Sequence, residues 1–151
     1  VPCAAILEGV EAAARSLAQS AGVALSWDAP ADLGTLQVDR ARLEDALRRL
    51  LTRAVAETPA GGRVTLSARR LAEELIVEVR DGGPPLAADR LRAALEPFAA
   101  AAGAAGGARG ADSSLAIARR QVEVCGGRLE AEAAAHGAVL RIRLPVGHAD
   151  R

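Results

Sequence analysis

The chain has 151 residues, of which 50% are hydrophobic and 25% charged, which is enough to bury the core of one globular domain. Its 19 basic and 19 acidic side chains cancel, so no overall field favours nucleic acid or an anionic membrane surface as a partner. The longest apolar runs are short and rich in alanine, and they predict no membrane span and no membrane contact by this domain.

The two cysteines, Cys3 and Cys125, lie far apart and outside any metal-binding spacing. They predict free thiols and a cytoplasmic protein. The first residues do not resemble a signal peptide, and a start at Val1 suggests a piece of a longer protein.

Helical and strand-like patterns alternate along the first part of the chain. Apolar residues at helical spacing predict a helix over Ala4–Ala21, which Gly22 ends. A strand is predicted over Val23–Trp27. The strongest helix is predicted over Val38–Glu57, with Asp39 as its N-cap. Its apolar stripe consists of Leu43, Leu47, Leu50, Leu51, Ala54 and Val55.

A hairpin and a sharp turn follow this helix. Strands are predicted over Arg63–Arg69 and Leu75–Arg80, and no regular element can cross Asp81–Pro85. A short helix is predicted over Ala87–Leu95, and the low-complexity stretch Ala99–Ser114 predicts a mobile loop.

The last part of the chain completes the sheet. A helix is predicted over Leu115–Val124, followed by strands over Arg128–Glu132 and Ala138–Leu144. Taken together, the elements predict an α+β sandwich, in which helices cover one face of a mixed or largely antiparallel sheet.

Six short motifs occur in a characteristic order along this chain. They are Val38–Leu51, Thr58–Gly62 (TPAGG), Val77–Gly83 (VEVRDGG), Glu96–Phe98 (EPF), Leu115–Gly127 and Leu140–Pro145 (LRIRLP). In this order they resemble the catalytic and ATP-binding domain of a sensor histidine kinase. The resemblance implies a two-layer α/β sandwich of the GHKL (Bergerat) ATPase type, shared with gyrase, Hsp90 and MutL-type proteins.

The resemblance also implies a division of the chain. Residues 1–22 would be the end of a dimerisation helix and its linker, 23–146 the ATPase-like domain, and 147–151 a tail. The phosphoacceptor histidine of such kinases would lie upstream, because neither His136 nor His148 has the required context. This piece is therefore not expected to phosphorylate itself.

The nucleotide site of the family needs a carboxylate for the adenine amino group, glycine-rich backbone around the phosphates and a magnesium ion. Asp81 takes the place of the adenine-binding aspartate, and Gly82 and Gly83 would let a purine approach the backbone. The alternative is that Asp81 only forms a turn. Pro85 replaces a glycine of the family, which removes an amide donor.

Arginines stand where the family has two asparagines, the second of which binds magnesium. These positions are Arg49 and Arg53, and a guanidinium has no lone pair with which to bind a metal. Either Arg53 replaces the cation and pairs with phosphate, or the site has become an ordinary charged surface. The i,i+4 spacing of Asp45, Arg49, Arg53 and Glu57 favours the second interpretation.

The glycine-rich lid of the family is also altered. Of its glycines only Gly110 remains, and Asp112 would place a negative charge near the phosphates. Arg109 could pair with Asp112 or with phosphate, and Ser113 and Ser114 could cap the following helix.

These departures predict a degenerate, pseudokinase-like domain with no catalytic and no metal-binding residues. The residues left to contact a nucleotide, if one binds, are Asp81, Gly83, Arg53, Arg49, Arg109 and Gly110. No cofactor is expected, and ATP or ADP would bind only weakly, without magnesium held in the usual way.

The domain is expected to act in a phosphorelay by docking. Its expected partners are its own dimerisation helices, another histidine kinase or a response-regulator receiver domain, with Phe98 and Asp112 as candidate docking residues. The alternative is a divergent but active sensor histidine kinase that binds ATP through Asp81 and phosphate through Arg53 or Arg109. A third possibility is an anti-sigma-factor kinase or an MutL-type fragment.

Overall fold

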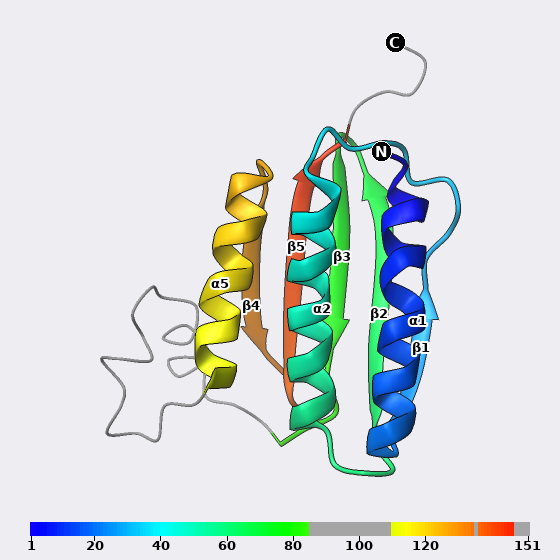
Figure 1. Cartoon of the computed structure of the whole chain (residues 1–151), viewed down its shortest axis with the longest axis vertical. Coiled ribbons are helices and arrows are strands. Elements are labelled where there is room, and N and C mark those ends of the chain that lie inside the picture. Colours follow the sequence, from blue (N-terminus) through cyan, green and yellow to red (C-terminus); the bar gives the residue numbers. More distant parts are fainter. Residues whose placement is uncertain (85–109, 135, 147–151) are drawn as a thin grey trace.

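The computed structural model describes residues 1–84, 110–134 and 136–146, and for residues 110–113 it describes the helical backbone alone. Within these residues, three helices cover one face of a five-stranded sheet (Figure 1). The predicted α+β sandwich is confirmed. None of the described helices is both long enough and apolar enough to span a bilayer.

The sheet is mixed, as predicted. Its strands are β1 (Ala24–Asp28), β2 (Arg63–Leu71), β3 (Glu74–Arg80), β4 (Arg128–Ala133) and β5 (Ala138–Pro145). They lie in the order β1-β2-β3-β5-β4. Only β1 and β2 run parallel, and the other neighbouring pairs are antiparallel.

The predicted end of α1 and the predicted start of α2 are confirmed by their caps. They are α1 (Cys3–Ala21), α2 (Arg40–Glu57) and α5 (Gly110–Val124). Gly22 ends α1 in the left-handed region, with φ of 71°. At the start of α2, Asp39 Oδ1 accepts a hydrogen bond from the N–H of Arg42 at 3.3 Å, which confirms the predicted N-cap.

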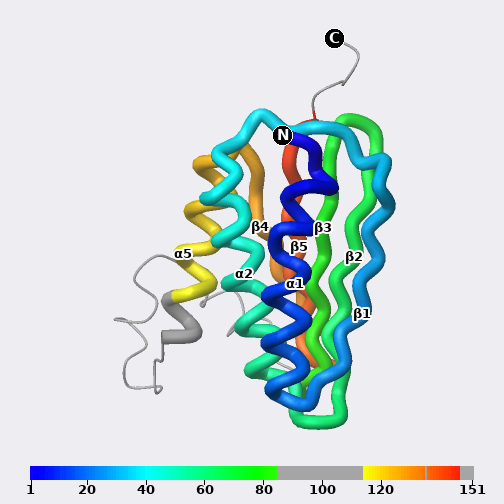
Figure 2. The backbone as a smooth tube through the Cα atoms, turned by 45° about the vertical axis from the view of Figure 1, so that its right-hand side comes forward, coloured from blue at the N-terminus to red at the C-terminus, as the bar shows by residue number. Residues whose placement is uncertain are grey.

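One hydrophobic core lies between the helices and the sheet. The predicted stripe of α2 is buried against it, as are alternate residues of β3, such as Leu75 and Val77. The side of α1 that faces α2 contributes Cys3, Ile6, Leu7, Val10, Ala14 and Ala18. Residues 1–22 therefore pack as part of the same globular unit, and Figure 2 shows α1 running beside α2 over the sheet.

The start of α5 corrects one prediction. The predicted loop over Ala99–Ser114 is wrong in its last part, because the helix begins at Gly110. Glycine, aspartate and serine are weak helix formers, so local propensity favoured a loop there. Tertiary packing overrides it, since Leu115 and Ala118 are completely buried. The predicted helix over Ala87–Leu95 lies outside the described residues.

The sheet face away from the helices carries a network of ion pairs. Arg143 bridges Glu130 and Glu74, with nitrogen–oxygen distances of 2.9 and 3.2 Å. Beside it, Arg141 pairs with Glu78 at 2.7 Å. Cross-strand pairs of opposite charge stabilise a sheet modestly, so this face is held by mutual pairing of its own side chains.

This network predicts a loss of stability in acid. The hydrogen bond from Arg143 holds the pKa of Glu130 below its ordinary value of 4.5, aided by nearby Arg128 and Arg141. Because the pKa is lower in the folded state, the contribution is present above the unfolded pKa and is lost as pH falls through the folded one. We expect the stability difference between the wild type and Glu130→Gln to be below about 1 kcal/mol at neutral pH. It should shrink as pH falls below the ordinary pKa of glutamate and through the lower pKa of the folded state, as followed by urea unfolding. A difference that does not change with pH would contradict this assignment.

Candidate functional site

The turn after β3 carries the aspartate that the sequence places in the nucleotide site, and the chain itself holds this aspartate firmly. Asp81 is buried, with 6% of its surface exposed. Its N–H donates to the carbonyl oxygen of Ala138 at 3.2 Å, and its Oδ1 accepts from the N–H of Gly83 at 2.9 Å. The second bond closes an Asx turn. Asp81 thus forms a turn, which was the alternative role considered for it from the sequence. Its second carboxylate oxygen, Oδ2, faces α2.

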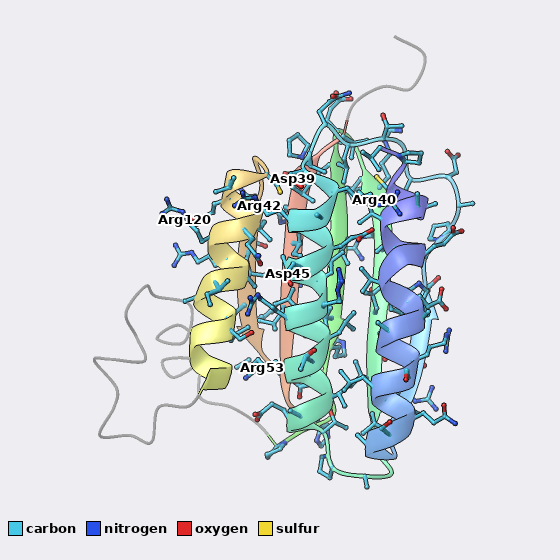
Figure 3. The ribbon with its side chains drawn as sticks, viewed as in Figure 1. Asp39, Arg40, Arg42, Asp45, Arg53 and Arg120 are labelled. Atoms are coloured by element: carbon cyan, nitrogen blue, oxygen red, sulfur yellow. The ribbon has the colours of Figure 1, made fainter. Side chains whose placement is uncertain are left out.

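Arg53 of α2 faces that oxygen. Its Nη1 lies 3.6 Å from Asp81 Oδ2, and the two side chains are only 7% and 4% exposed. The distance is that of an ion pair without a good hydrogen bond, and Arg53 Nη1 is a buried nitrogen that has no hydrogen-bond partner among the residues that the structure describes. Figure 3 shows the Arg53 side chain on the side of α2 that faces α5. The chain therefore pairs two of its own candidate nucleotide-binding residues with each other.

The ion pair between Arg53 and Asp81 corrects part of the pairing expected from the i,i+4 spacing along α2. The expected pair of Asp45 and Arg49 is confirmed, with Arg49 Nε 3.0 Å from Asp45 Oδ2. The expected pair of Arg53 and Glu57 is wrong, because Arg53 faces Asp81 while Glu57 is exposed. Spacing along one helix shows which residues are neighbours on it, but not which of its faces another element covers. The description of Arg53 as an exposed surface charge is therefore wrong.

Arg49 is used to join α2 to α5. Its Nη1 lies 3.5 Å from Ser114 Oγ, at the edge of hydrogen-bond range. Asp45 Oδ2 accepts from both Arg49 and Gln121 Nε2, the latter at 2.7 Å. The hydrogen bond from Gln121, aided by Arg49, lowers the pKa of Asp45. Arg49 thus contacts Asp45 and Ser114 of the chain itself. Ser114, which was considered as a cap of α5, lies within that helix.

Three glycines pack closely around Asp81. A Cβ at Gly83 would overlap the carbonyl oxygen of Glu57, and one at Gly82 would lie 2.8 Å from the carbonyl oxygen of Arg63. A Cβ at Gly137 would overlap Asp81 Oδ1. Close contacts within the chain already account for glycine at these positions, so their presence is no evidence that a purine approaches the backbone there.

Thr58 and Gly137 belong to the site but were missed from the sequence. Thr58 Oγ1 donates to the carbonyl oxygen of Ala54 at 2.7 Å and accepts from the N–H of Gly82 at 3.0 Å. This hydroxyl fastens the turn to the end of α2. Thr58 was identified only as part of the motif Thr58–Gly62, and neither Thr58 nor Gly137 was given a role in the nucleotide site. The hydroxyl directly after a buried helical stripe was the available signal for Thr58.

The remaining candidate residues are placed only in part. Gly110 is the first residue of α5, and Asp112 lies in its first turns, where the backbone alone is described. Arg109, Phe98 and Pro85 lie outside the described residues. The structure thus brings together Asp81, Gly83 and Arg53, and it places Arg49 further along the same helix face towards α5.

The donor set does not fit a magnesium ion held in the manner of the family. Magnesium needs oxygen ligands, and the side chain at the asparagine position is a buried guanidinium that carries its own positive charge. Within the described part of the chain, no group of three histidine, cysteine, aspartate or glutamate side chains could replace that ligand. No step that passes through a metal ion is derived for this chain.

Comparison with known proteins agrees with the fold and with the order of the motifs. Residues 38–148 match the family described as histidine kinase-, DNA gyrase B- and HSP90-like ATPase. The chain is 32% identical over 143 residues to histidine protein kinase DivJ of Caulobacter vibrioides, covering 92% of this chain and 24% of DivJ. It is 44% identical over 66 residues to sensor protein DivL of the same organism, covering 44% of this chain and 9% of DivL. The chain thus spans about a quarter of DivJ and less of DivL.

A solved structure shows the same fold. The catalytic domain of histidine kinase ThkA superposes with a TM-score of 0.80 at 19% identity, over 96% of this chain and 92% of that one. The predicted GHKL-type sandwich is therefore confirmed.

Proposed function

The chain belongs to the family of histidine kinase-, DNA gyrase B- and HSP90-like ATPases, and from this premise we propose that it is a degenerate member that acts by docking to other proteins. It is a histidine-kinase-like ATPase domain of a two-component signalling protein. In the proposed role it works in the cytoplasm as a regulatory module and does not turn over ATP.

The observation that carries this proposal is the ion pair between Arg53 and Asp81. In a nucleotide-binding member of the family, the aspartate accepts from adenine and the helix supplies a metal ligand. Here Asp81 is committed to Gly83 and Arg53, and both charged side chains are more than nine-tenths buried. An adenine that displaces Arg53 from Asp81 would leave a buried guanidinium without its carboxylate, which is costly unless phosphate takes the place of that carboxylate.

The partners proposed for the domain follow from its family. Histidine kinases dimerise through helices and act on response regulators, so we propose its own dimerisation helices, another histidine kinase or a receiver domain. Phe98 and Asp112 stay candidate contacts in this role, together with the surface around them.

A divergent, active kinase domain is the second candidate, and one observation favours it. In the described part of the chain, the buried Arg53 Nη1 has no hydrogen-bond partner, so it could donate to a phosphate oxygen while Asp81 still accepts from adenine. Arg49, Arg109 and Gly110 would then assist. This candidate requires nucleotide binding that depends on Asp81 and only weakly on magnesium.

Thermal unfolding with and without nucleotide separates the two candidates. A ligand present at 100 times its Kd stabilises a protein by about 2.7 kcal/mol, which raises Tm by several degrees. We expect Tm to change by less than about 1 °C in millimolar ATP or ADP, with or without magnesium. A rise of several degrees that Asp81→Asn abolishes would contradict the docking proposal and support the active kinase.

A further inference from the structure

Strand β1 leaves one edge of the sheet open. Among the strands that the structure describes, it stands at one end of the sheet order and pairs only with β2. The N–H of Ala24 donates to the carbonyl oxygen of Gly62 at 2.9 Å, so the backbone groups of Ala24, and of every second residue after it, point to β2. The backbone groups of Leu25 and Trp27 therefore point away from the sheet. Within the described part of the chain, neither N–H has a hydrogen bond to the backbone outside the strand ladders, and the ladder with β2 uses the alternate residues.

A groove of about 140 Å³ lies beside this open edge, between α1 and the segment that follows β1. Its apolar lining includes Leu7 and Pro30 and the half-buried ring of Trp27. Trp27 thus presents its backbone to the open edge and its side chain to the groove. An extended chain paired with β1 would have its own alternate side chains within reach of the groove.

The charges at this groove are acidic. Among the described residues, Glu8 and Glu11 are the charged ones that line it, and Asp28 lies directly after Trp27 on the strand. Arg15 pairs with Glu11 at 2.7 Å. Glu8 is exposed, and among the described residues it forms no ion pair. The groove therefore favours a cationic side chain over an anionic one.

We propose that the open edge of β1 binds an extended basic peptide of a partner protein. The peptide adds a strand beside β1, with its backbone bonded to Leu25 and Trp27. An arginine or lysine of the peptide enters the groove, its stem lying on Trp27 and its charge facing Glu8. This inference rests on the docking function proposed above and gives it a partner chemistry.

The first test varies the peptide and leaves the protein unchanged. The probe is a short fluorescent peptide of alternating valine and arginine with blocked ends, titrated with the whole chain and followed by anisotropy. We expect saturable binding that weakens as salt rises. Binding should fall by about tenfold or more when alternate backbone amides are N-methylated, or when glutamate replaces arginine. No nucleotide is present, so failure here leaves the outcome of the nucleotide experiment untouched.

The second test varies the protein. Glu8→Lys changes an exposed helix residue and should weaken binding by about fivefold without loss of stability. Glu123→Lys makes the same charge change on α5, which lies on the same face of the sheet but beside β4, at the edge opposite to β1 (Figure 1), and should leave binding unchanged. Leu25→Pro removes an N–H at the open edge while the bonds of Ala24 to β2 remain, and it should reduce binding about tenfold.

Several results would overturn the proposal. They are the absence of binding at about millimolar protein, a preference for the glutamate peptide, and an affinity indifferent to both N-methylation and Glu8→Lys. Self-association of the chain that Leu25→Pro abolishes would also overturn it, because the edge would then belong to a second copy.

Discussion

Replacing Arg53 by methionine should lower the free energy of unfolding by about 3 kcal/mol, because it leaves the carboxylate of Asp81 buried without a cation. Both side chains are more than nine-tenths buried, so water cannot replace the missing partner at low cost. Asp81→Asn should destabilise by a comparable amount, since it leaves the guanidinium unpaired while keeping the acceptor for Gly83. Urea unfolding monitored by circular dichroism measures both losses.

Two further variants make this prediction specific. The double variant Arg53→Met/Asp81→Asn has no buried charge left and should recover most of the stability, which reveals the coupling between the two sites. Arg49→Met, one turn earlier on α2, removes a partly exposed arginine paired with Asp45 and should cost less than about 1 kcal/mol. Equal losses for Arg49→Met and Arg53→Met would contradict the assignment of a buried pair.

Gly137→Ala should also lower the free energy of unfolding, by about 3 kcal/mol, because two unfavourable contributions add. Gly137 has φ of 71°, where residues with a Cβ are strained. The added methyl group would overlap Asp81 Oδ1 and push that side chain out of its turn. The loss is measured as the shift of the urea midpoint multiplied by the slope of the transition.

Gly126→Ala is the matched control for this variant. Gly126 has φ of 90°, and nothing lies within 4 Å of the position that a Cβ would take. The substitution therefore carries the backbone strain alone and should cost about 1 kcal/mol. If both glycine variants lose the same stability, the contact between Gly137 and Asp81 does not matter and this part of the site is wrong.

The elements of the fold could be predicted because each one shows its own periodicity. The stripe of α2 from Leu43 to Val55 and the alternation in β3 are local patterns, and burial follows from them. The first turns of α5 could not be predicted, because Gly110, Asp112, Ser113 and Ser114 are weak helix formers. They become helical through contacts that the rest of α5 makes with α2.

The sequence predicted which residues form the candidate site, but not which of them contact one another. Asp81, Gly83 and Arg53 were identified from their positions in the motifs, and the structure brings them together. Arg53 pairs with Asp81 and not with Glu57 because of how the turn after β3 packs against α2, and spacing along one helix gives no information about that packing. The role of Gly137 was equally hidden, because it lies 56 positions along the chain from the aspartate that it supports.

Calorimetric titration of the wild-type chain with ATP and ADP, in magnesium and in EDTA, shows directly whether the chain binds a nucleotide. We expect no heat of binding in any of these conditions up to millimolar nucleotide, because Asp81 is paired with Arg53 and the side chain of Arg53 cannot bind a metal ion. Binding that requires magnesium would contradict it, since no ligand for the ion is left at the position of Arg53. Binding that persists in EDTA and is lost in Arg53→Ala would instead show that the arginine has replaced the metal ion.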